Sequence, residues 1–220
     1  MAITGGSGSG KSTVAEALLR HCAPNYAVIF HEDGYYWPRA VAREMELAAG
    51  RSGEIDLVNF DDPASKDMAF MSSQLAQLKA GQSIAQPVYD YDRHDRSQAT
   101  RTIEPCPLII LEGIHALSVP AVRKLIDLSV YVDTPDDLRL ARRIRRDVLE
   151  RERTVASVLE QYLSTVRAAH YQFTYPTMFQ ADLVIADEGL PAYGEVTPSE
   201  AAITRMLAPM LARLQAEGVL

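Results

Sequence analysis

The residues between positions 5 and 13 have types and spacing that suit the binding of a phosphorylated ligand. The run reads Gly-Gly-Ser-Gly-Ser-Gly-Lys-Ser-Thr, which matches the phosphate-loop pattern Gly-x-x-x-x-Gly-Lys-Ser/Thr. Glycines let the backbone turn tightly, so that its N–H groups can face an anion. The helix that follows adds its positive dipole end. We therefore expect Lys11 to reach the terminal phosphates of a nucleoside triphosphate and the Ser12 hydroxyl to bind Mg²⁺.

The predicted phosphate contacts are shared between the loop and the first turn of the following helix: Gly6, Gly8, Ser9, Gly10, Lys11, Ser12 and Thr13. A flexible glycine-serine linker is the alternative interpretation of the same run. However, the run stands between a short apolar segment at 1–4 and a helical pattern with Val14, Leu18 and Leu19 apolar. That context is the one a phosphate loop requires.

Three acidic residues, Asp33, Glu112 and Asp133, come at the ends of apolar runs. In open α/β sheets, ligands bind outside the carboxyl ends of the strands. We expect Glu112 to hold Mg²⁺ directly or through water, and we count Asp33 as a further candidate ligand of that ion. Asp33 is also placed to accept the proton of a substrate hydroxyl, because a carboxylate with an ordinary pKa of ~3.9 is ionised at neutral pH. For Asp133, which precedes Thr-Pro-Asp, we favour a helix N-cap.

Arginines are concentrated in one segment, since seven of the eighteen lie between Arg139 and Arg153. Phosphoryl transfer needs cations around the negative charge that spreads in the transition state. A helical segment at about 139–170 could supply them and close over the site as a lid. The alternative is a solvated helix face paired with neighbouring acids, and we expect this for Arg139, Arg142 and Arg145.

The elements that must position these residues indicate an α/β fold. Apolar runs at 27–30, 108–111, 128–132 and 183–185 are typical of a buried parallel sheet. Helices are predicted after the phosphate loop, at 68–78 with Gly81 as the stop, across 136–170, and onwards from a capping box at 197–200. Short strands at 84–90 and 100–104 flank a polar turn and predict a β-hairpin. The segment 37–63 is predicted to be irregular, and we treat 1–220 as one domain.

The chain of 220 residues has a formal net charge of −7. A protein that binds nucleic acid over much of its surface is usually basic, so nucleic acid is not an expected partner. No run approaches the roughly 18 apolar residues that a membrane span needs, and the N-terminus lacks the pattern of a signal peptide. Cys22 and Cys106 form no CxxC pair, which argues against a disulfide scaffold or a cysteine zinc site and makes the cytoplasm the default location.

Further motifs follow the phosphate loop in order along nearly the whole chain. They are Asp-Gly-Tyr-Tyr at 33–36, Asn-Phe-Asp-Asp-Pro at 59–63, Pro-Val-Tyr-Asp-Tyr at 87–91 with His94, Leu-Glu-Gly-Ile at 111–114, Val-Asp-Thr-Pro at 132–135, Arg-Arg-Ile-Arg-Arg-Asp at 142–147 with Arg151 and Arg153, and Glu-Gln-Tyr at 160–162. In this order the chain resembles the uridine-cytidine kinase family of phosphate-loop kinases. The resemblance implies phosphoryl transfer from ATP or GTP, with Mg²⁺, to the 5′-hydroxyl of uridine or cytidine. It also implies a homo-oligomer, and the hairpin at 84–104 would lie over the acceptor site.

The matching positions imply roles for individual residues. Asp33 resembles the catalytic base that faces the 5′-hydroxyl, acting with Lys11 and Arg146. Asp61 resembles a ligand of the ribose hydroxyls, and Gln161 a ribose or base contact. The family's aromatic wall around the pyrimidine is resembled by Tyr36, Phe60, Tyr89 and Tyr91, and its base-reading histidine by His94. The family's arginines that reach the sugar and the phosphates are resembled by Arg143 and Arg146, and its lid arginines over the phosphates by Arg151 and Arg153.

Two of these assignments have plainer alternatives in the residues themselves. Tyr89 and Tyr91 could be cross-strand packing, and His94 could be a surface histidine in a turn. The segment Ala186-Asp187-Glu188-Gly189 also stands where family members often have a Pro-Arg-Gly-Gly turn. The affinity for the phosphoryl donor and the choice of donor therefore stay open.

Two other functions also stay open at this point. One is a related kinase of another small alcohol, such as a sugar phosphate, pantothenate or nicotinamide riboside. Arg39, Arg43 and Arg51 could bind a phosphorylated acceptor of that kind, although the aromatic hairpin argues against it. The other is a nucleotide-binding regulatory module without transfer activity, which the two candidate acids Asp33 and Glu112 disfavour.

Overall fold

A five-stranded parallel sheet forms the centre of the molecule in the computed structural model, which describes residues 1–55, 58–187 and 199–220. The strands are β1 (Ala2–Thr4), β2 (Ala27–His31), β5 (Leu108–Glu112), β6 (Ser129–Asp133) and β7 (Leu183–Ala186). Their order in the sheet is β2-β5-β1-β6-β7, and every neighbouring pair is parallel. The predicted α/β fold is therefore confirmed, and the apolar runs are its buried strands.

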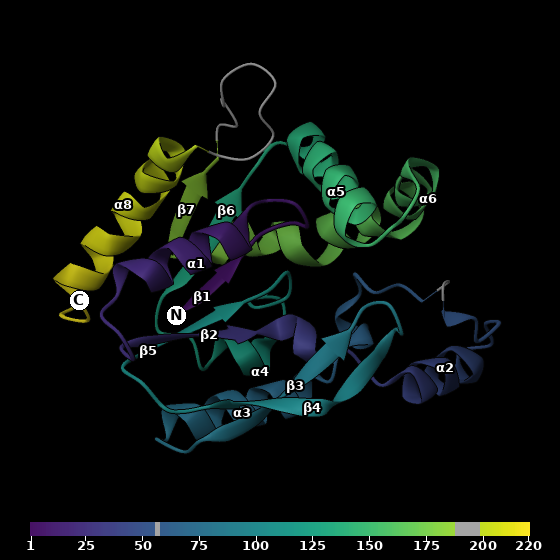
Figure 1. Ribbon diagram of the computed structural model, residues 1–220, viewed down its shortest axis with the longest axis horizontal. Coiled ribbons are helices and arrows are strands. Elements are labelled where there is room, and N and C mark those ends of the chain that lie inside the picture. Colours follow the sequence, from purple (N-terminus) through teal and green to yellow (C-terminus); the bar gives the residue numbers. More distant parts are fainter. Residues whose placement is uncertain (56–57, 188–198) are drawn as a thin grey trace.

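Alternation along each strand divides the core between the two faces of the sheet. Ile3 and Ile110 face one side, where they pack with helices α1 (Lys11–His21) and α8 (Glu200–Ala216). Ala2 and Leu111 face the other side, where α3 (Met68–Lys79) and the short helix α4 (Pro120–Arg123) cover them. Figure 1 shows these two layers on opposite sides of the sheet. Because both faces are covered, the strands need apolar side chains on both sides.

The predicted hairpin consists of β3 (Ile84–Asp90) and β4 (Asp95–Ile103), which pair antiparallel. The second strand begins earlier than the predicted range 100–104, because its polar residues pair with β3 without packing into a core. The hairpin lies against the 3₁₀ turn η1 (Glu32–Tyr35) that follows β2. A Cβ on Gly34 would collide with the Pro87 carbonyl oxygen. A glycine at position 34 therefore lets the hairpin approach the end of β2.

The arginine-rich segment is helical, as predicted. It comprises α5 (Asp136–Glu150) and α6 (Val155–Gln161), followed by wider helical turns at Tyr162–Val166 and His170–Thr174 on either side of α7 (Arg167–Ala169), and a 3₁₀ stretch at Tyr175–Gln180. Figure 1 shows α5 and α6 at the same edge of the molecule, beyond the carboxyl ends of the strands.

The prediction for residues 37–63 was wrong. The segment 37–63 is not irregular throughout, since it contains helix α2 (Arg39–Ala48). That helix buries the small side chain of Ala42, which packs in a cluster with Ile55 and Val58, and the charged side chain of Glu46, so its buried face is not a run of large apolar residues. The C-terminal helix begins at Glu200 with the Ser199 hydroxyl accepting a hydrogen bond from the Ala202 N–H. The preceding part of the predicted capping box lies outside the described residues.

Within the described part of the chain, no helix combines the length and the apolar character that crossing a bilayer requires.

Candidate active site

The phosphate loop connects β1 to α1 and adopts the backbone that its glycines permit. Gly8 and Gly10 have φ angles of 80° and 85°, a region that other residues rarely enter. A Cβ on Gly8 would also collide with the Arg139 carbonyl oxygen, and one on Gly6 with the Arg139 guanidinium. The loop therefore packs closely on the start of α5, which explains why small residues are needed there.

Lys11, Ser12 and Glu112 come together at the carboxyl ends of β1 and β5. The Ser12 hydroxyl donates to Glu112 Oε1 at 2.9 Å, and Lys11 Nζ lies 3.5 Å from the same oxygen. Burial tends to raise the pKa of Glu112, but the Lys11 charge and the hydrogen bonds from His31 and Ser12 lower it below its usual value. A hydroxyl and an ionised carboxylate are the hard oxygen donors that Mg²⁺ prefers, usually beside water and phosphate oxygens. The residues present therefore fit that ion.

Asp33 lies in the 3₁₀ turn after β2, on the hairpin side of the same edge. Its Oδ1 accepts a hydrogen bond from Lys66 Nζ at 2.9 Å, and its Oδ2 accepts one from the Tyr91 hydroxyl at 2.7 Å. Burial opposes ionisation here, but the charges of Lys66 and Lys11 outweigh it and hold the pKa of Asp33 well below its usual range. Asp33 is therefore an ionised hydrogen-bond acceptor at neutral pH.

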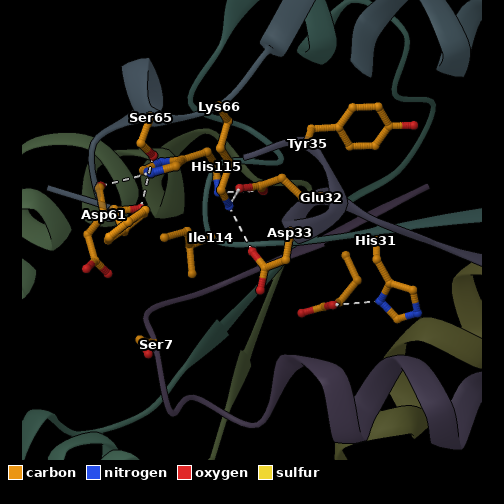
Figure 2. A network of polar contacts seen from close by, with 12 residues as sticks. Ser7, His31, Glu32, Asp33, Tyr35, Asp61, Ser65, Lys66, Ile114 and His115 are labelled. Atoms are coloured by element: carbon orange, nitrogen blue, oxygen red, sulfur yellow. Dashed lines mark hydrogen bonds and ion pairs between the residues drawn. The ribbon is translucent and has the colours of Figure 1, made fainter. Parts of the chain in front are cut away.

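A buried network of charges lies directly behind Asp33, and sequence reasoning missed it (Figure 2). Lys66 Nζ donates to Glu32 as well as to Asp33, and the side chains of both Lys66 and Glu32 are fully buried. Glu32 Oε2 accepts a further hydrogen bond from the backbone N–H of His115 at 2.8 Å. Burial would lower the pKa of Lys66, but the two carboxylates raise it well above its usual value. The signal for this network in the sequence was weak, because it consisted of one lysine in a loop and one acidic residue next to Asp33.

The five predicted aromatic residues of the nucleoside site form one group of packed rings. Tyr36 contacts Phe60 and Tyr89, with ring centroids 5.7 and 4.9 Å apart. Phe60 stacks on His94 at 5.3 Å, and Tyr89 meets Tyr91 at 5.4 Å. The rings come from Tyr36, which directly follows η1, from the loop before α3 and from the hairpin. They pack on one another, and the Tyr91 hydroxyl also joins the group to Asp33.

Asp61 lies on the phosphate-loop side of this group, and its main chain is tied to the loop after β5. Its carbonyl oxygen accepts from His115 Nε2 at 2.9 Å. Burial raises the pKa of the Asp61 carboxyl, although the Arg143 charge opposes the rise. A small cavity separates Asp61 from the phosphate loop, with a lining made by Ser7, Asp61, Ile114, Val166, His170 and Thr174. The predicted ribose ligand and the phosphate loop thus face a common space.

The predicted arginines converge on one carboxylate that sequence reasoning also missed. Asp147 is fully buried and accepts a hydrogen bond from Arg146 Nε at 2.8 Å. The guanidinium groups of Arg143, Arg151 and Arg153 lie 3.5–3.7 Å from the same carboxylate. The motif Arg-Arg-Asp hinted at this, but only the fold shows that all four arginines share one acid.

Contacts of these arginines reach both sides of the site. Arg143 Nη1 donates to Ser7 of the phosphate loop at 2.9 Å, and Gln161 Oε1 accepts from Arg143 and from Arg153. The Arg151 guanidinium lies over the Tyr91 ring, 4.3 Å from its centroid. The structure therefore brings Arg143, Arg151, Arg153 and Gln161 together, and their predicted contacts with sugar, base and phosphates stay predictions.

The solvated helix face expected of three other arginines is present only in part. Arg145 is exposed, whereas Arg139 is buried under the phosphate loop and pairs with Asp136 at 2.6 Å. Arg142 is also largely buried and pairs with Asp187 at 2.6 Å. The expected pairing with a neighbouring acid is present for Arg139, but the expected exposure to solvent was wrong for both arginines, because the glycines of the phosphate loop let α5 approach closely.

Two further acids, Asp133 and Asp187, lie at the carboxyl ends of β6 and β7. Asp133 is not the N-cap that we expected. Pro135 occupies that position, and Asp133 is exposed at the end of β6. Asp187, from the segment that departs from the family pattern, is buried. The rest of that segment, Glu188 and Gly189, lies outside the described residues.

Comparisons with known proteins identify the family of the chain. A model of the phosphoribulokinase / uridine kinase family matches residues 1–190. A uridine kinase of Alkaliphilus metalliredigens is 41% identical over 188 residues, which is 85% of this chain and 86% of that protein. One of Lactiplantibacillus plantarum is 43% identical over 187 residues, with the same shares of the two chains covered.

Solved structures show the same fold at lower sequence identity. Phosphoribulokinase from Rhodobacter spheroides superposes with a TM-score of 0.61 at 16% identity, covering 90% of this chain and 73% of that one. D-glycerate 3-kinase from Cryptococcus neoformans gives a TM-score of 0.61 at 14% identity, with 79% and 76% covered. The family model and the identities above 40% decide the relationship: the chain belongs to the phosphoribulokinase / uridine kinase family.

Proposed function

We propose that this protein is a phosphotransferase that moves the γ-phosphoryl group of ATP or GTP to the 5′-hydroxyl of uridine or cytidine. One observation carries the proposal beyond the family. The Tyr91 hydroxyl of the hairpin donates to Asp33, and Asp33 lies at the same sheet edge as Lys11, Ser12 and Glu112. An acceptor carboxylate, an aromatic wall and a phosphate loop are thus parts of one site. The relatives named uridine kinases support this choice of substrate.

On the donor side, the loop N–H groups and Lys11 would bind the phosphates. Ser12 and Glu112 would hold Mg²⁺, which neutralises charge on the phosphate oxygens when it is bound. Lys11 lies in contact with Glu112, so its ammonium is already directed to the place where the phosphates would meet the ion. These groups act mainly by positioning the phosphates and offsetting their charge.

On the acceptor side, the 5′-hydroxyl oxygen would attack the γ-phosphorus in line with the bond to the leaving nucleoside diphosphate. The new O–P bond forms as the old one breaks, and the hydroxyl proton passes to Asp33. A carboxylate with a lowered pKa is a weak base. However, the transition state of such transfers is loose, so orienting the hydroxyl matters more than removing its proton early. Asp33 is therefore suited to the part of an orienting acceptor.

Recognition of the nucleoside is assigned to the ring group and to Asp61. A nucleoside is neutral and flat, so aromatic faces and a few hydrogen bonds suit it. His94 stacks on Phe60 at the hairpin turn, which supports its role in reading the base. Arg146, Arg151 and Arg153 would exchange part of their contact with Asp147 for the phosphates when the helices close. A cytoplasmic location and a homo-oligomeric state stay predictions.

A phosphorylated acceptor is less well supported by the arginines considered for it. Arg51 forms a two-point ion pair with Glu46 at 2.5 and 2.7 Å. The Arg39 backbone N–H donates a hydrogen bond to the Asp95 carboxylate, and the Arg39 guanidinium donates one to the Arg93 carbonyl oxygen. These contacts tie Arg51 to α2 and Arg39 to the hairpin turn.

A coupled assay of nucleotide consumption with an acceptor panel tests the proposal. It would contain Mg²⁺, ATP or GTP, and uridine, cytidine, adenosine, ribulose 5-phosphate, pantothenate or nicotinamide riboside. We expect turnover with uridine or cytidine alone. Turnover with another acceptor would keep the site but replace the substrate. No turnover with any acceptor, with nucleotide binding intact, would favour a regulatory module.

A further inference from the structure

The buried ammonium behind Asp33 points to a function that the phosphate-loop chemistry does not require. We propose that Lys66 is a positioning residue that fixes Asp33 for the acceptor hydroxyl, with Glu32 as the anchored counter-ion that keeps Lys66 in place. This inference rests on the proposed function, because it assigns the part that Asp33 plays in the transfer.

The backbone determines where Lys66 lies. Residues Tyr36 and Lys66 form an isolated antiparallel bridge, and the Asp67 N–H donates to the Tyr35 carbonyl at 2.8 Å. The loop before α3 is thereby held along the turn that carries Asp33. The side chain of Lys66 is then directed inward, where it is fully buried.

The surroundings of Lys66 satisfy a charge that would otherwise be costly to bury. Its Nζ donates to Glu32 and to Asp33, and it lies 4.3 Å from the centroid of the Tyr36 ring. Two carboxylates and one aromatic face thus surround one ammonium. Since Tyr36 belongs to the ring group, Lys66 contacts both the Asp33 carboxylate and the aromatic wall of the nucleoside site.

Glu32 is the fixed end of this arrangement. It accepts from the His115 N–H, and a Cβ on Gly113 would collide with its carboxylate. Glu32 therefore packs directly on the loop that follows Glu112, with no room to move toward that loop. His115 also bonds the Asp61 carbonyl, so the same loop holds Glu32 and the segment that carries Lys66.

Asp33, by contrast, has few constraints of its own. It sits in a short 3₁₀ turn, and its side chain is 49% exposed. Among the described residues, Lys66 and Tyr91 are its hydrogen-bond donors. Tyr91 belongs to the wall that a nucleoside would contact, so its bond would change on binding. Lys66 cannot change in this way, because it is buried on the far side of the carboxylate. Lys66 therefore holds Oδ1 of Asp33, so that Oδ2 is the oxygen that can face the hydroxyl of the acceptor nucleoside.

Lys66 could instead have a purely structural function, in which it only neutralises Glu32. Removing the charges of both Lys66 and Glu32 distinguishes that function from the positioning of Asp33. Lys66→Met alone leaves two carboxylates without their cation and should destabilise the fold. Lys66→Met combined with Glu32→Gln removes the buried mismatch. If Lys66 only neutralises Glu32, the double variant should regain activity together with stability. If Lys66 positions Asp33, stability should return without activity.

We would measure the melting temperature, the Kd for ATP, and kcat and KM for uridine in the wild type and in both variants. Lys79→Met is the matched control, because Lys79 pairs with Asp127 at 2.8 Å away from the site. For the double variant, we expect a melting temperature near that of the wild type. Its kcat should fall about 10- to 100-fold, because a small misplacement of a reacting group has effects of this size. KM and Kd should stay within about threefold. Recovery of the wild-type kcat would overturn the proposal.

Crystal structures supply a readout that does not depend on activity. The double variant should show the Asp33 carboxylate displaced or in several orientations, and an unchanged carboxylate would overturn the proposal. Tyr91→Phe is a second variant, which keeps Lys66 and removes only a hydroxyl. Asp33 should keep its position in that variant, whereas displacement with Lys66 intact would also contradict the assignment. A wild type that turns over no nucleoside would defeat the proposed function, and these structures would still decide the part of Lys66.

Discussion

At the donor end of the site, one continuous stretch of chain supplies most of the binding groups, whereas four separate segments meet at the acceptor end. Residues 5–13 form the phosphate loop through their backbone, and Glu112 joins them from the end of β5. Asp33 depends on Lys66 from the loop before α3, on Tyr91 from the hairpin, and through Glu32 on the loop after β5. A contiguous motif can be recognised from its letters, while an assembled group becomes visible only when the fold is known.

The largest expected effect is at the donor end. Lys11→Ala should reduce kcat by about 10³-fold or more and weaken nucleotide binding, because it removes a cation from the phosphates. Steady-state kinetics and ATP binding measured on the same preparation check this. Full activity of the variant would remove the phosphate-loop assignment.

The arginine group should respond through stability as well as through rate. Asp147→Asn leaves four guanidinium groups around a neutral side chain, and the free energy of unfolding should fall by on the order of 3 kcal/mol. Urea unfolding would measure it, with the exposed Glu150→Gln of the same helix as the control. Equal effects of the two substitutions would show that Asp147 does not organise the arginines.

At the acceptor end, His94→Ala should act on the nucleoside alone. Loss of a ring stacked on Phe60 should raise KM for uridine about 3- to 10-fold, or up to about 1.4 kcal/mol, without changing KM for ATP. The exposed Arg93→Ala is the neighbouring control. An equal rise in KM for every acceptor on the panel would argue against base reading.

A smaller effect is expected on the pH dependence of stability, to which one buried histidine at each end of the site should contribute. Burial lowers the pKa of His115, in the acceptor network, to about 3 and that of His170, beside the phosphate loop, to about 4. Their unfolded pKa is about 6.5. Below that pH the unfolded chain binds protons that the folded chain does not, so stability falls as the pH decreases toward 4.

From pH 7 to pH 6 the loss should be below about 1 kcal/mol for each histidine. Unfolding free energies measured between pH 7 and pH 5 would record it. His170→Gln should remove its share of the slope, whereas the exposed His21→Gln should not. An unchanged slope in His170→Gln would mean that this ring is not buried in the neutral form.

Much of the fold was predictable because the buried parallel strands are unbroken apolar runs. The hairpin and the arginine-rich helices were also predictable from local pattern. Helix α2 was not, because the residues that it buries are the small Ala42 and the charged Glu46. At the site, Asp33, Lys11, Ser12 and Glu112 could be named from motif and strand end. Lys66, Glu32, His115 and Asp147 could not, because a buried charge looks like a surface charge until its partner is known.

The most direct test of the account compares nucleotide binding with transfer in Asp33→Asn. The variant is isosteric, and the donor groups lie on separate segments from Asp33. We expect the Kd for ATP to be unchanged and kcat with uridine to fall by about 10²–10⁴-fold. A variant that keeps the wild-type kcat, or that loses ATP binding together with activity, would contradict the claim that Asp33 acts on the acceptor.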